Sequence, residues 1–170
     1  MLTLQKFIAD DPAILARLCE LIDAAFQFSR DTCPPECEGM YIPEGKEIYE
    51  HHELGHDIHL ILSDGVLIGG AVVAIDENDY HTLELLFIDP QAEGKGLGTD
   101  AWFLLEKAYP DAPVWGLATP PYLKGNVHFY VNKCGFAITK FYHAGNPKPS
   151  PEGGPEIDYN DLFWFEKKMK

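Results

Sequence analysis

The spacing of apolar residues changes repeatedly along the chain, and each change predicts a new element. Alternating or β-branched apolar runs predict strands, whereas apolar residues three and four positions apart predict helices. The two patterns intermingle along the chain, which is typical of a mixed α/β layered fold. The predicted strands span residues 2–8, 58–62, 66–75, 82–88, 114–118, 136–143 and 161–166, and the predicted helices span residues 12–28, 46–54, 94–109 and 126–133.

Three predicted strands, between residues 58 and 88, follow one another with only polar turns between them. This succession is typical of an antiparallel meander. Residues 144–155 are rich in Pro and Gly, but this segment is short for an interdomain linker and is interpreted as a surface loop. With 170 residues, of which 46% are hydrophobic, the chain can bury one core without disulfides. We therefore predict a single domain over residues 1–170.

The net charge of the chain limits the classes of partner that it is expected to bind. Asp and Glu number 27 against 13 Lys and Arg, which gives a formal net charge of -14. A surface of this sign repels nucleic-acid phosphates and anionic lipids and favours the approach of cations such as amines. We expect no nucleic-acid or membrane partner. The chain also starts without a basic, apolar signal sequence, so we expect a soluble, cytoplasmic protein whose four cysteines are reduced thiols.

A glycine-rich turn carries the first chemical signal. It follows the apolar strand, and residues 94–98 have glycine at every second position before a helix begins. Glycine lets the backbone approach a phosphate, and the N–H groups and dipole of the first helical turn favour its negative charge. Lys95 adds a cation and Thr99 a hydroxyl. The spacing fits neither a dinucleotide fingerprint nor a P-loop, and a flexible loop with a helix cap is the alternative.

Two segments resemble the motifs of a known family. Residues 91–96, Gln-Ala-Glu-Gly-Lys-Gly, match the Gln/Arg-x-x-Gly-x-Gly/Ala motif of the GNAT superfamily of acyl-CoA-dependent N-acetyltransferases. Residues 126–136 resemble the Asn-x-x-x-x-Phe/Tyr-Tyr-x-x-x-Gly-Phe segment of the same family. Two motifs in this order are more specific than either alone. The resemblance covers residues 83–142, and the earlier elements agree with the family in their order.

The resemblance implies a GNAT-like mixed sheet, mostly antiparallel and splayed between its fourth and fifth strands, with acetyl-CoA as co-substrate in the cleft. It implies transfer of the acetyl group to a primary amine by direct attack in a ternary complex, and we assign no metal. Backbone groups of the fourth strand would pair with pantetheine, the glycine-rich turn would hold the pyrophosphate, and Asn126 would contact pantetheine. The implied cofactor-binding residues are Phe87, Ile88, Gln91, Gly94, Lys95, Gly96, Gly98, Thr99 and Asn126.

Acetyl transfer from a thioester needs an acid for the departing sulfur. The resemblance assigns this role to Tyr130, which matches the tyrosine that protonates the thiolate in many family members. An aromatic residue beside Phe129 would also fit the buried face of an amphipathic helix, and this is the alternative for Tyr130. Cys134 precedes a glycine at a helix end, and we expect it to be packed rather than nucleophilic.

The reaction also needs a base for the amine. Glu84 is the candidate, because it interrupts an apolar strand and because period-two alternation would place it on one face with Leu86 and Ile88. A solvent-facing glutamate is the alternative, since some family members use water chains. His81 and His128 are the second and third options for the base.

A competing signal comes from the histidines. Residues 52–56 spell His-Glu-x-x-His, a zinc-protease signature, but a glycine weakens the helix that this motif needs and a third ligand is absent. Cys33 and Cys37 together with His52 and His56 have a spacing within reach of a tetrahedral zinc site. The alternative function is therefore a zinc-stabilised CoA-binding or regulatory module without catalysis, and a zinc hydrolase ranks after it.

The hypothesis does not specify which amine accepts the acetyl group. Residues 29–56 connect the first helix to the second strand, a region that covers the acceptor pocket in the family. Their acidic side chains would attract an amine, or they would form a solvated loop. Small polyamines, amino acids, aminoglycosides and protein N-termini all stay open as acceptors, and so does the oligomeric state, a homodimer included.

Overall fold

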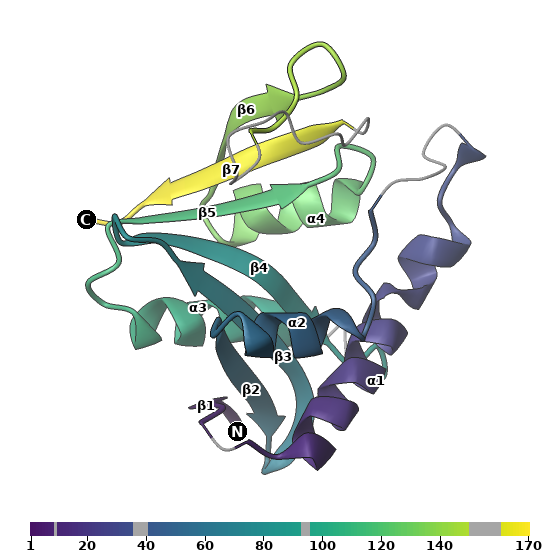
Figure 1. The fold of residues 1–170 in the computed structure, drawn as a ribbon, viewed down its shortest axis with the longest axis vertical. Helices are drawn as coiled ribbons and strands as arrows, with labels where there is room; N and C mark the ends of the chain where they lie inside the picture. Colours follow the sequence, from purple (N-terminus) through teal and green to yellow (C-terminus); the bar gives the residue numbers. More distant parts are fainter. Residues whose placement is uncertain (9, 36–40, 93–95, 150–160) are drawn as a thin grey trace.

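A seven-stranded sheet with the order β1-β2-β3-β4-β5-β7-β6 forms the centre of the molecule (Figure 1). The computed structural model describes residues 1–8, 10–35, 41–92, 96–149 and 161–170. The strands are β1 (Leu2–Lys6), β2 (Asp57–Ser63), β3 (Val66–Ile75), β4 (Tyr80–Ile88), β5 (Val114–Thr119), β6 (Ala137–Tyr142) and β7 (Leu162–Lys168). The helices are α1 (Pro12–Asp31), α2 (Glu47–Glu53), α3 (Leu97–Ala108) and α4 (Lys124–His128), and α4 continues into a π-helical segment (Phe129–Lys133).

Each predicted element has a counterpart, and the ends differ where capping rather than apolar spacing sets them. The α1 helix starts as predicted, because Asp11 accepts the N–H of Ala13 at 2.9 Å and Pro12 occupies the first position. It continues to Asp31, beyond the predicted end at residue 28, since the Thr32 hydroxyl and N–H both donate to the Phe28 carbonyl. Among the described helices, none combines the length and the apolar character needed to cross a bilayer.

The sheet opens between β4 and β5. These two strands are parallel and pair over residues 80–82 and 114–116, whereas the other neighbouring strands are antiparallel. Beyond that point β4 continues along β3 and β5 continues along β7, so the carboxyl ends of β4 and β5 diverge. The predicted mixed, mostly antiparallel sheet with a splay between its fourth and fifth strands is confirmed.

Two apolar clusters cover the two faces of the sheet. On one face, α1 and α2 pack over the half formed by β2, β3 and β4, with Leu18 and Ile48 fully buried. On the other face, Trp102 of α3 contacts a cluster that includes Leu83 of β4, Trp115 of β5 and Phe165 of β7. The α3 side therefore holds both halves of the split sheet together, while α1 and α2 border the split from the opposite side.

Candidate active site

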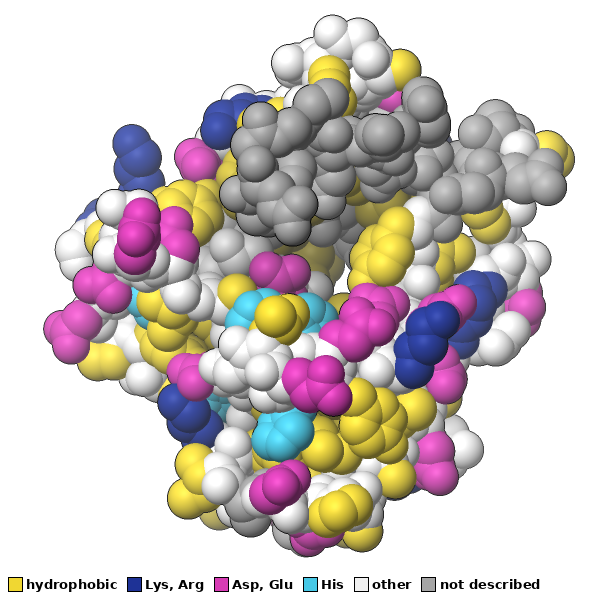
Figure 2. All heavy atoms as spheres, in the orientation of Figure 1, with side chains coloured by type: hydrophobic (Ala, Val, Ile, Leu, Met, Phe, Trp, Pro, Cys, Tyr) yellow, Lys and Arg dark blue, Asp and Glu magenta, His cyan; other side chains and the backbone are white. Residues whose placement is uncertain are grey.

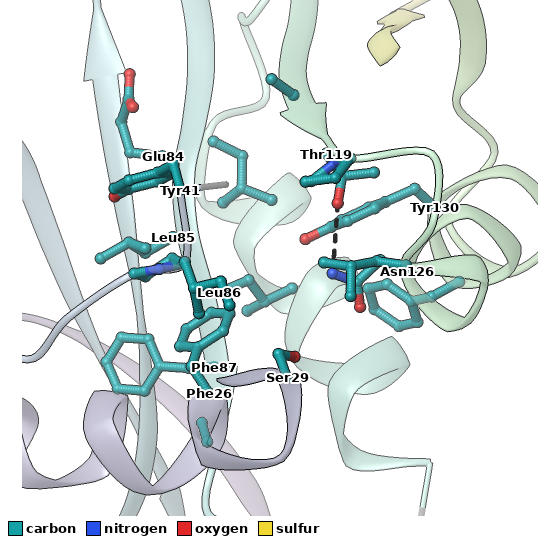
Figure 3. Close-up of a pocket in the computed structure, with 18 of the residues that line it drawn as sticks. Phe26, Ser29, Tyr41, Glu84, Leu85, Leu86, Phe87, Thr119, Asn126 and Tyr130 are labelled. Atoms are coloured by element: carbon teal, nitrogen blue, oxygen red, sulfur yellow. Dashed lines mark hydrogen bonds between the residues drawn. The ribbon is translucent and has the colours of Figure 1, made fainter. Parts of the chain in front are cut away.

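A pocket of about 780 Å³ occupies the split in the sheet. Its walls are residues 82–88 of β4, the end of β5, the first turn of α3, α4 with its π-helical segment, the end of α1 and one side of α2. This volume is in the range of small-molecule sites, and ligands of open α/β sheets bind beyond the carboxyl ends of diverging parallel strands. Figure 3 shows β4 residues on one side of the pocket and Thr119, Asn126 and Tyr130 on the other.

The first turn of α3 forms one corner of this pocket. Gly96 caps the helix with φ at 73°, a left-handed conformation that glycine adopts without strain, and its carbonyl accepts the N–H groups of Thr99 and Asp100 at 3.1 Å. Gly96, Gly98 and Thr99 all line the pocket next to Ile88. The N–H groups of a first helical turn have no acceptor inside the helix, so this corner is suited to an anion.

Gln91, Gly94 and Lys95 are the other residues of this turn that the sequence predicted to bind the cofactor. Gly94 and Lys95 lie outside the described residues. Gln91 is exposed, and its backbone N–H donates to the Asp89 carboxylate at 3.0 Å in the turn that follows β4. Gln91 is not among the described residues that line the pocket, so its side chain is a poorer candidate for contact with a ligand there.

Tyr130 combines a packed ring with a hydroxyl at the pocket. The ring contacts Phe129, Phe136 and Phe165, with centroids 5.0, 5.9 and 6.0 Å away. Figure 3 shows the hydroxyl directed into the split, near Asn126, whose side-chain amide donates to the Thr119 hydroxyl at 3.4 Å. Burial, and to a smaller extent Cys134, raise the pKa of the Tyr130 hydroxyl, which therefore keeps its proton at neutral pH.

The helix that carries Tyr130 departs from α-helical geometry. The Cys134 N–H donates to the Phe129 carbonyl at 3.1 Å, an i to i+5 bond that widens the last turn. Four residues separate Tyr130 from Gly135, whereas the family motif has three between its tyrosine and glycine. Three residues also separate Asn126 from Tyr130, whereas the motif has five, and Tyr130 still lines the pocket. Such π-helical turns occur frequently at functional sites.

Cys134 is packed away from the pocket. It is 1% exposed and belongs to the cluster around Trp102, Trp115 and Phe165. Burial raises the pKa of the thiol to about 12, an effect that Lys167 partly opposes. Since the thiolate is the nucleophilic form, a buried neutral thiol does not act as an acyl acceptor.

A β-bulge changes the predicted surroundings of Glu84. Val72 pairs with Leu85 and the next residue, Val73, pairs with Leu83, so Glu84 is an additional residue on β4. The regular alternation that placed Glu84 with Leu86 is therefore interrupted, because Leu83 and Leu86 contact the α3 cluster. Glu84 is exposed and lines the pocket beside Tyr41, and Figure 3 shows it directed away from Tyr130. The predicted shared face was wrong, because pairing with β3 sets the register.

The two other candidate bases lie elsewhere in the described part of the chain. His81 is 6% exposed, its Nδ1 is 2.8 Å from the Asp79 carbonyl oxygen, and its ring contacts Tyr109 and Trp115. His128 lies on an exposed side of α4, where its Nδ1 is 2.9 Å from the Asn132 amide. Neither of them is among the described residues that line the pocket.

The His-Glu-x-x-His segment does not form the helical metal site of a zinc protease. The α2 helix ends at Glu53, and Gly55 has φ at 73°, so His56 lies outside the helix. His52 contacts Asp10 at 3.3 Å, whereas the Nδ1 of His56 is 2.9 Å from that of His51. Cys37 lies outside the described residues, and the remaining described chain holds no group of three or more His, Cys, Asp or Glu placed to bind one metal ion.

The expectation that residues 29–56 cover the acceptor pocket did not specify which of their side chains face it, and one side of α2 forms a wall of the observed pocket. Residues at helical spacing on this helix, together with the segment before it, line the pocket opposite Tyr130. In the orientation of Figure 1, acidic side chains are spread over this face and histidines gather over α2 (Figure 2). The spacing was visible in the sequence, but its direction depends on Ile48, which is fully buried against the sheet. The wall residues are Tyr41, Glu47, Glu50, His51 and Leu54.

The split between the parallel strands, the pocket inside it and the helix start at its corner define a GNAT-type fold. Solved structures share this fold. A Bacillus subtilis acetyltransferase in complex with CoA has a TM-score of 0.68 at 16% identity, with 100% of both chains covered. PaiA N-acetyltransferase from Thermoplasma acidophilum, in complex with coenzyme A, has a TM-score of 0.69 at 16% identity, with 99% of both chains covered.

Sequence similarity then places the chain in a family. The sequence profile described as "Acetyltransferase (GNAT) family" matches residues 15–136. The protein YrkN of Bacillus subtilis (strain 168), described as uncharacterized, is 38% identical over 143 residues, which cover 79% of this chain and 77% of YrkN. The chain belongs to the GNAT acetyltransferase family, and the predicted enzyme class, a GNAT-type N-acetyltransferase, is confirmed.

Proposed function

We propose that this protein transfers the acetyl group of acetyl-CoA to a primary amine by direct attack within a ternary complex. The observation that carries the proposal is the pocket in the split sheet, which brings the α3 start, Asn126 and Tyr130 together. The CoA and acetyl-CoA complexes of structurally similar acetyltransferases support the choice of co-substrate. The acidic balance of the chain supports a cationic acceptor.

The residues around the corner of α3 are proposed to hold the CoA part. The backbone N–H groups of residues 96–98 and the hydroxyl of Thr99 would bind the diphosphate, because the glycines leave the backbone accessible. The unpaired edge of β4 at Phe87 and Ile88 would hydrogen-bond the pantetheine arm like an added strand, and Asn126 would contact it from the other side. Gln91, Gly94 and Lys95 remain predictions of the sequence motif for the same group.

The acetyl transfer needs two proton movements. The neutral amine nitrogen attacks the thioester carbonyl carbon, a C–N bond forms and the C–S bond breaks. Tyr130 gives its proton to the departing sulfur, for which its raised pKa keeps it protonated, and the proton that the nitrogen loses passes to Glu84. Because Glu84 points away from Tyr130, we propose that this proton travels through water. Tyr130 is then reprotonated from solvent.

Thermal unfolding with and without acetyl-CoA tests the binding half of this proposal. Millimolar acetyl-CoA should raise Tm by several degrees, since a ligand at about 100 times its Kd adds roughly 2.7 kcal/mol to the stability of a folded protein. A free-thiol assay over a panel of amines then tests transfer. Absence of both stabilisation and thiol release would overturn the proposal.

Gly98→Glu locates the binding site at the α3 corner. A Cβ at Gly98 would meet only the Phe129 ring at 3.5 Å, so the backbone tolerates the change, but the carboxylate would occupy the proposed diphosphate position. We expect the acetyl-CoA-induced rise in Tm to vanish. Gly125→Glu is the matched control, because Gly125 faces open space outside the pocket lining. An unchanged rise in Gly98→Glu would remove the corner from the site.

A further inference from the structure

One side of α2 gives the pocket a wall with an uneven distribution of charge. Glu47, Glu50 and His51 face the pocket at helical spacing, and the bulged Glu84 of β4 lies on the same side. Of the described residues that line the pocket, these three glutamates are acidic and Lys148 is basic. The Lys148 ammonium lies 5.5 Å from the centre of the Trp164 ring on β7, which also lines the pocket.

One of the three carboxylates, that of Glu47, is hydrogen-bonded to the Tyr41 hydroxyl, and the charges of the other two act on the same hydroxyl. Tyr41 donates a hydrogen bond to Glu47, whose other oxygen accepts the Glu44 N–H at 2.7 Å. The pKa of Tyr41 is raised by burial first, then by the hydrogen bond with Glu47 and by the charges of Glu47, Glu84 and Glu50. These contacts fix Glu47 in place and bring three negative charges within electrostatic reach of one point on the wall.

The Lys46 ammonium at the start of α2 pairs with Glu44 at 2.7 Å and is also attracted by the charges of Glu50 and Glu47, but no Lys or Arg of the described part of α2 lines the pocket itself. His51 lies between the glutamates, and burial together with the neighbouring His56 lowers its pKa, so its ring is neutral at pH 7. Like charges at such distances repel one another, and a cation placed among them relieves the repulsion. Apolar residues, among them Phe26 and Leu54, line the space beside the wall and suit a methylene chain.

From this arrangement we propose that Glu50 and Glu47 bind a second ammonium group of the acceptor, while its first amine reacts at the thioester. The acceptor is therefore a linear aliphatic diamine or polyamine. This inference rests on the proposed function and deepens it. The Glu84 charge adds to the attraction, and the pocket of about 780 Å³, which the wall and Tyr130 both line, has room for a short carbon chain between the two amines.

Three probes of equal length test the inference: 1,4-diaminobutane, butylamine and 4-aminobutanoate. With acetyl-CoA fixed, we expect kcat/KM for the diamine to exceed that for butylamine about tenfold, more than the statistical factor of about two, and 4-aminobutanoate to be poorest. The preference should shrink as salt rises, because partly exposed charges are screened. Equal kcat/KM for diamine and butylamine would overturn the inference while leaving the proposed function intact.

Glu50→Gln identifies the residue responsible. Removing one exposed carboxylate should lower the diamine-to-butylamine ratio of kcat/KM about fivefold, and Glu50→Lys should lower it further. Glu53→Gln is the matched control, since Glu53 lies on the same helix, is exposed and is absent from the described pocket lining. An unchanged ratio in Glu50→Gln, or an equal fall in Glu53→Gln, would overturn the assignment.

Calorimetric binding of 1,4-diaminobutane and butylamine gives a readout that does not need turnover. Tighter binding of the diamine than of the monoamine, weakened by Glu50→Gln and not by Glu53→Gln, supports the wall even if no acetyl transfer is detected. No difference in binding between the two amines, in the presence of acetyl-CoA, contradicts it. Loss of acetyl-CoA binding and of transfer with every amine would instead contradict the proposed function.

Discussion

Tyr130 and Cys134 show how position on one helical segment separates chemistry from packing. Burial raises the pKa of both groups, but the tyrosine hydroxyl lies at the pocket and the thiol lies in the core. A raised pKa keeps the Tyr130 hydroxyl protonated at pH 7, which a proton donor requires, whereas it keeps the Cys134 thiol out of its nucleophilic, ionised form. The same physical effect is thus compatible with Tyr130 as a proton donor and disfavours Cys134 as an acyl carrier.

Replacing Tyr130 by Phe tests this role. We expect kcat to fall by about 100-fold or more, the usual contribution of a general acid, while the acetyl-CoA-induced rise in Tm persists because the ring still packs. Tyr49→Phe, a change at an exposed position of α2, should leave both unchanged. If Tyr130→Phe turns over at the original rate, another group protonates the sulfur.

At the scale of elements, one lysine joins three segments near the site. Lys167 of β7 forms an ion pair with Glu106 of α3 and donates to the Cys134 carbonyl at 2.8 Å, where the π-helical segment ends. Its ammonium also lies 5.5 Å from the centre of the Trp102 ring. Since the Lys167 and Glu106 side chains are only 18% and 20% exposed, the loss of one charge leaves the other poorly solvated.

Lys167→Met should therefore lower the free energy of unfolding by about 1–3 kcal/mol, even though Met fills much of the same space. Urea denaturation measures this change. Lys168→Met, at the exposed neighbouring position of β7, should change the stability by less than about 0.5 kcal/mol. Equal effects of the two variants would show that Lys167 is not a specific link between the segments.

At the scale of the whole molecule, a buried histidine of β2, His59, couples stability to pH. The Tyr109 hydroxyl donates to Asp57 at 2.7 Å, so it accepts the Nε2–H of His59, also at 2.7 Å. His59 Nδ1 is buried without a hydrogen-bond partner in the described structure. A proton on Nδ1 would be a buried charge, and burial lowers the pKa of His59 to about 4.

The sign of the pH effect follows from that pKa. Between pH 6.5 and pH 4 the unfolded chain binds a proton at residue 59 that the folded chain excludes, so the free energy of unfolding falls as the pH is lowered through this window. His59→Leu should flatten this part of the stability curve, as measured by urea denaturation at a series of pH values. His128→Gln, at an exposed site, should not, and an unaltered slope in His59→Leu would contradict the role of His59.

Helix and strand ends that neighbouring residues determine were predictable from the sequence. The start of α1 at Asp11 and Pro12, and the whole span of β3, follow from capping chemistry and apolar period, which act between near neighbours in the chain. The glycine-rich turn before α3 was also visible, although the helix begins at Leu97 and not at residue 94, because Gly96 adopts a positive φ outside the helix. The splay of the sheet came from the family resemblance, because strand order is not encoded in any one segment.

Tertiary structure alone decided what the pocket presents to an acceptor. The surroundings of Glu84 depend on a bulge set by pairing with β3, and the direction of Glu47 and Glu50 depends on how Ile48 packs α2 against the sheet. The bulge and the packing of α2 both involve residues that are distant in sequence. The spacing of apolar residues within one segment does not specify how that segment pairs or packs with another. The sequence by itself therefore determined the elements and the anion corner, whereas long-range packing decided which charges meet across the split.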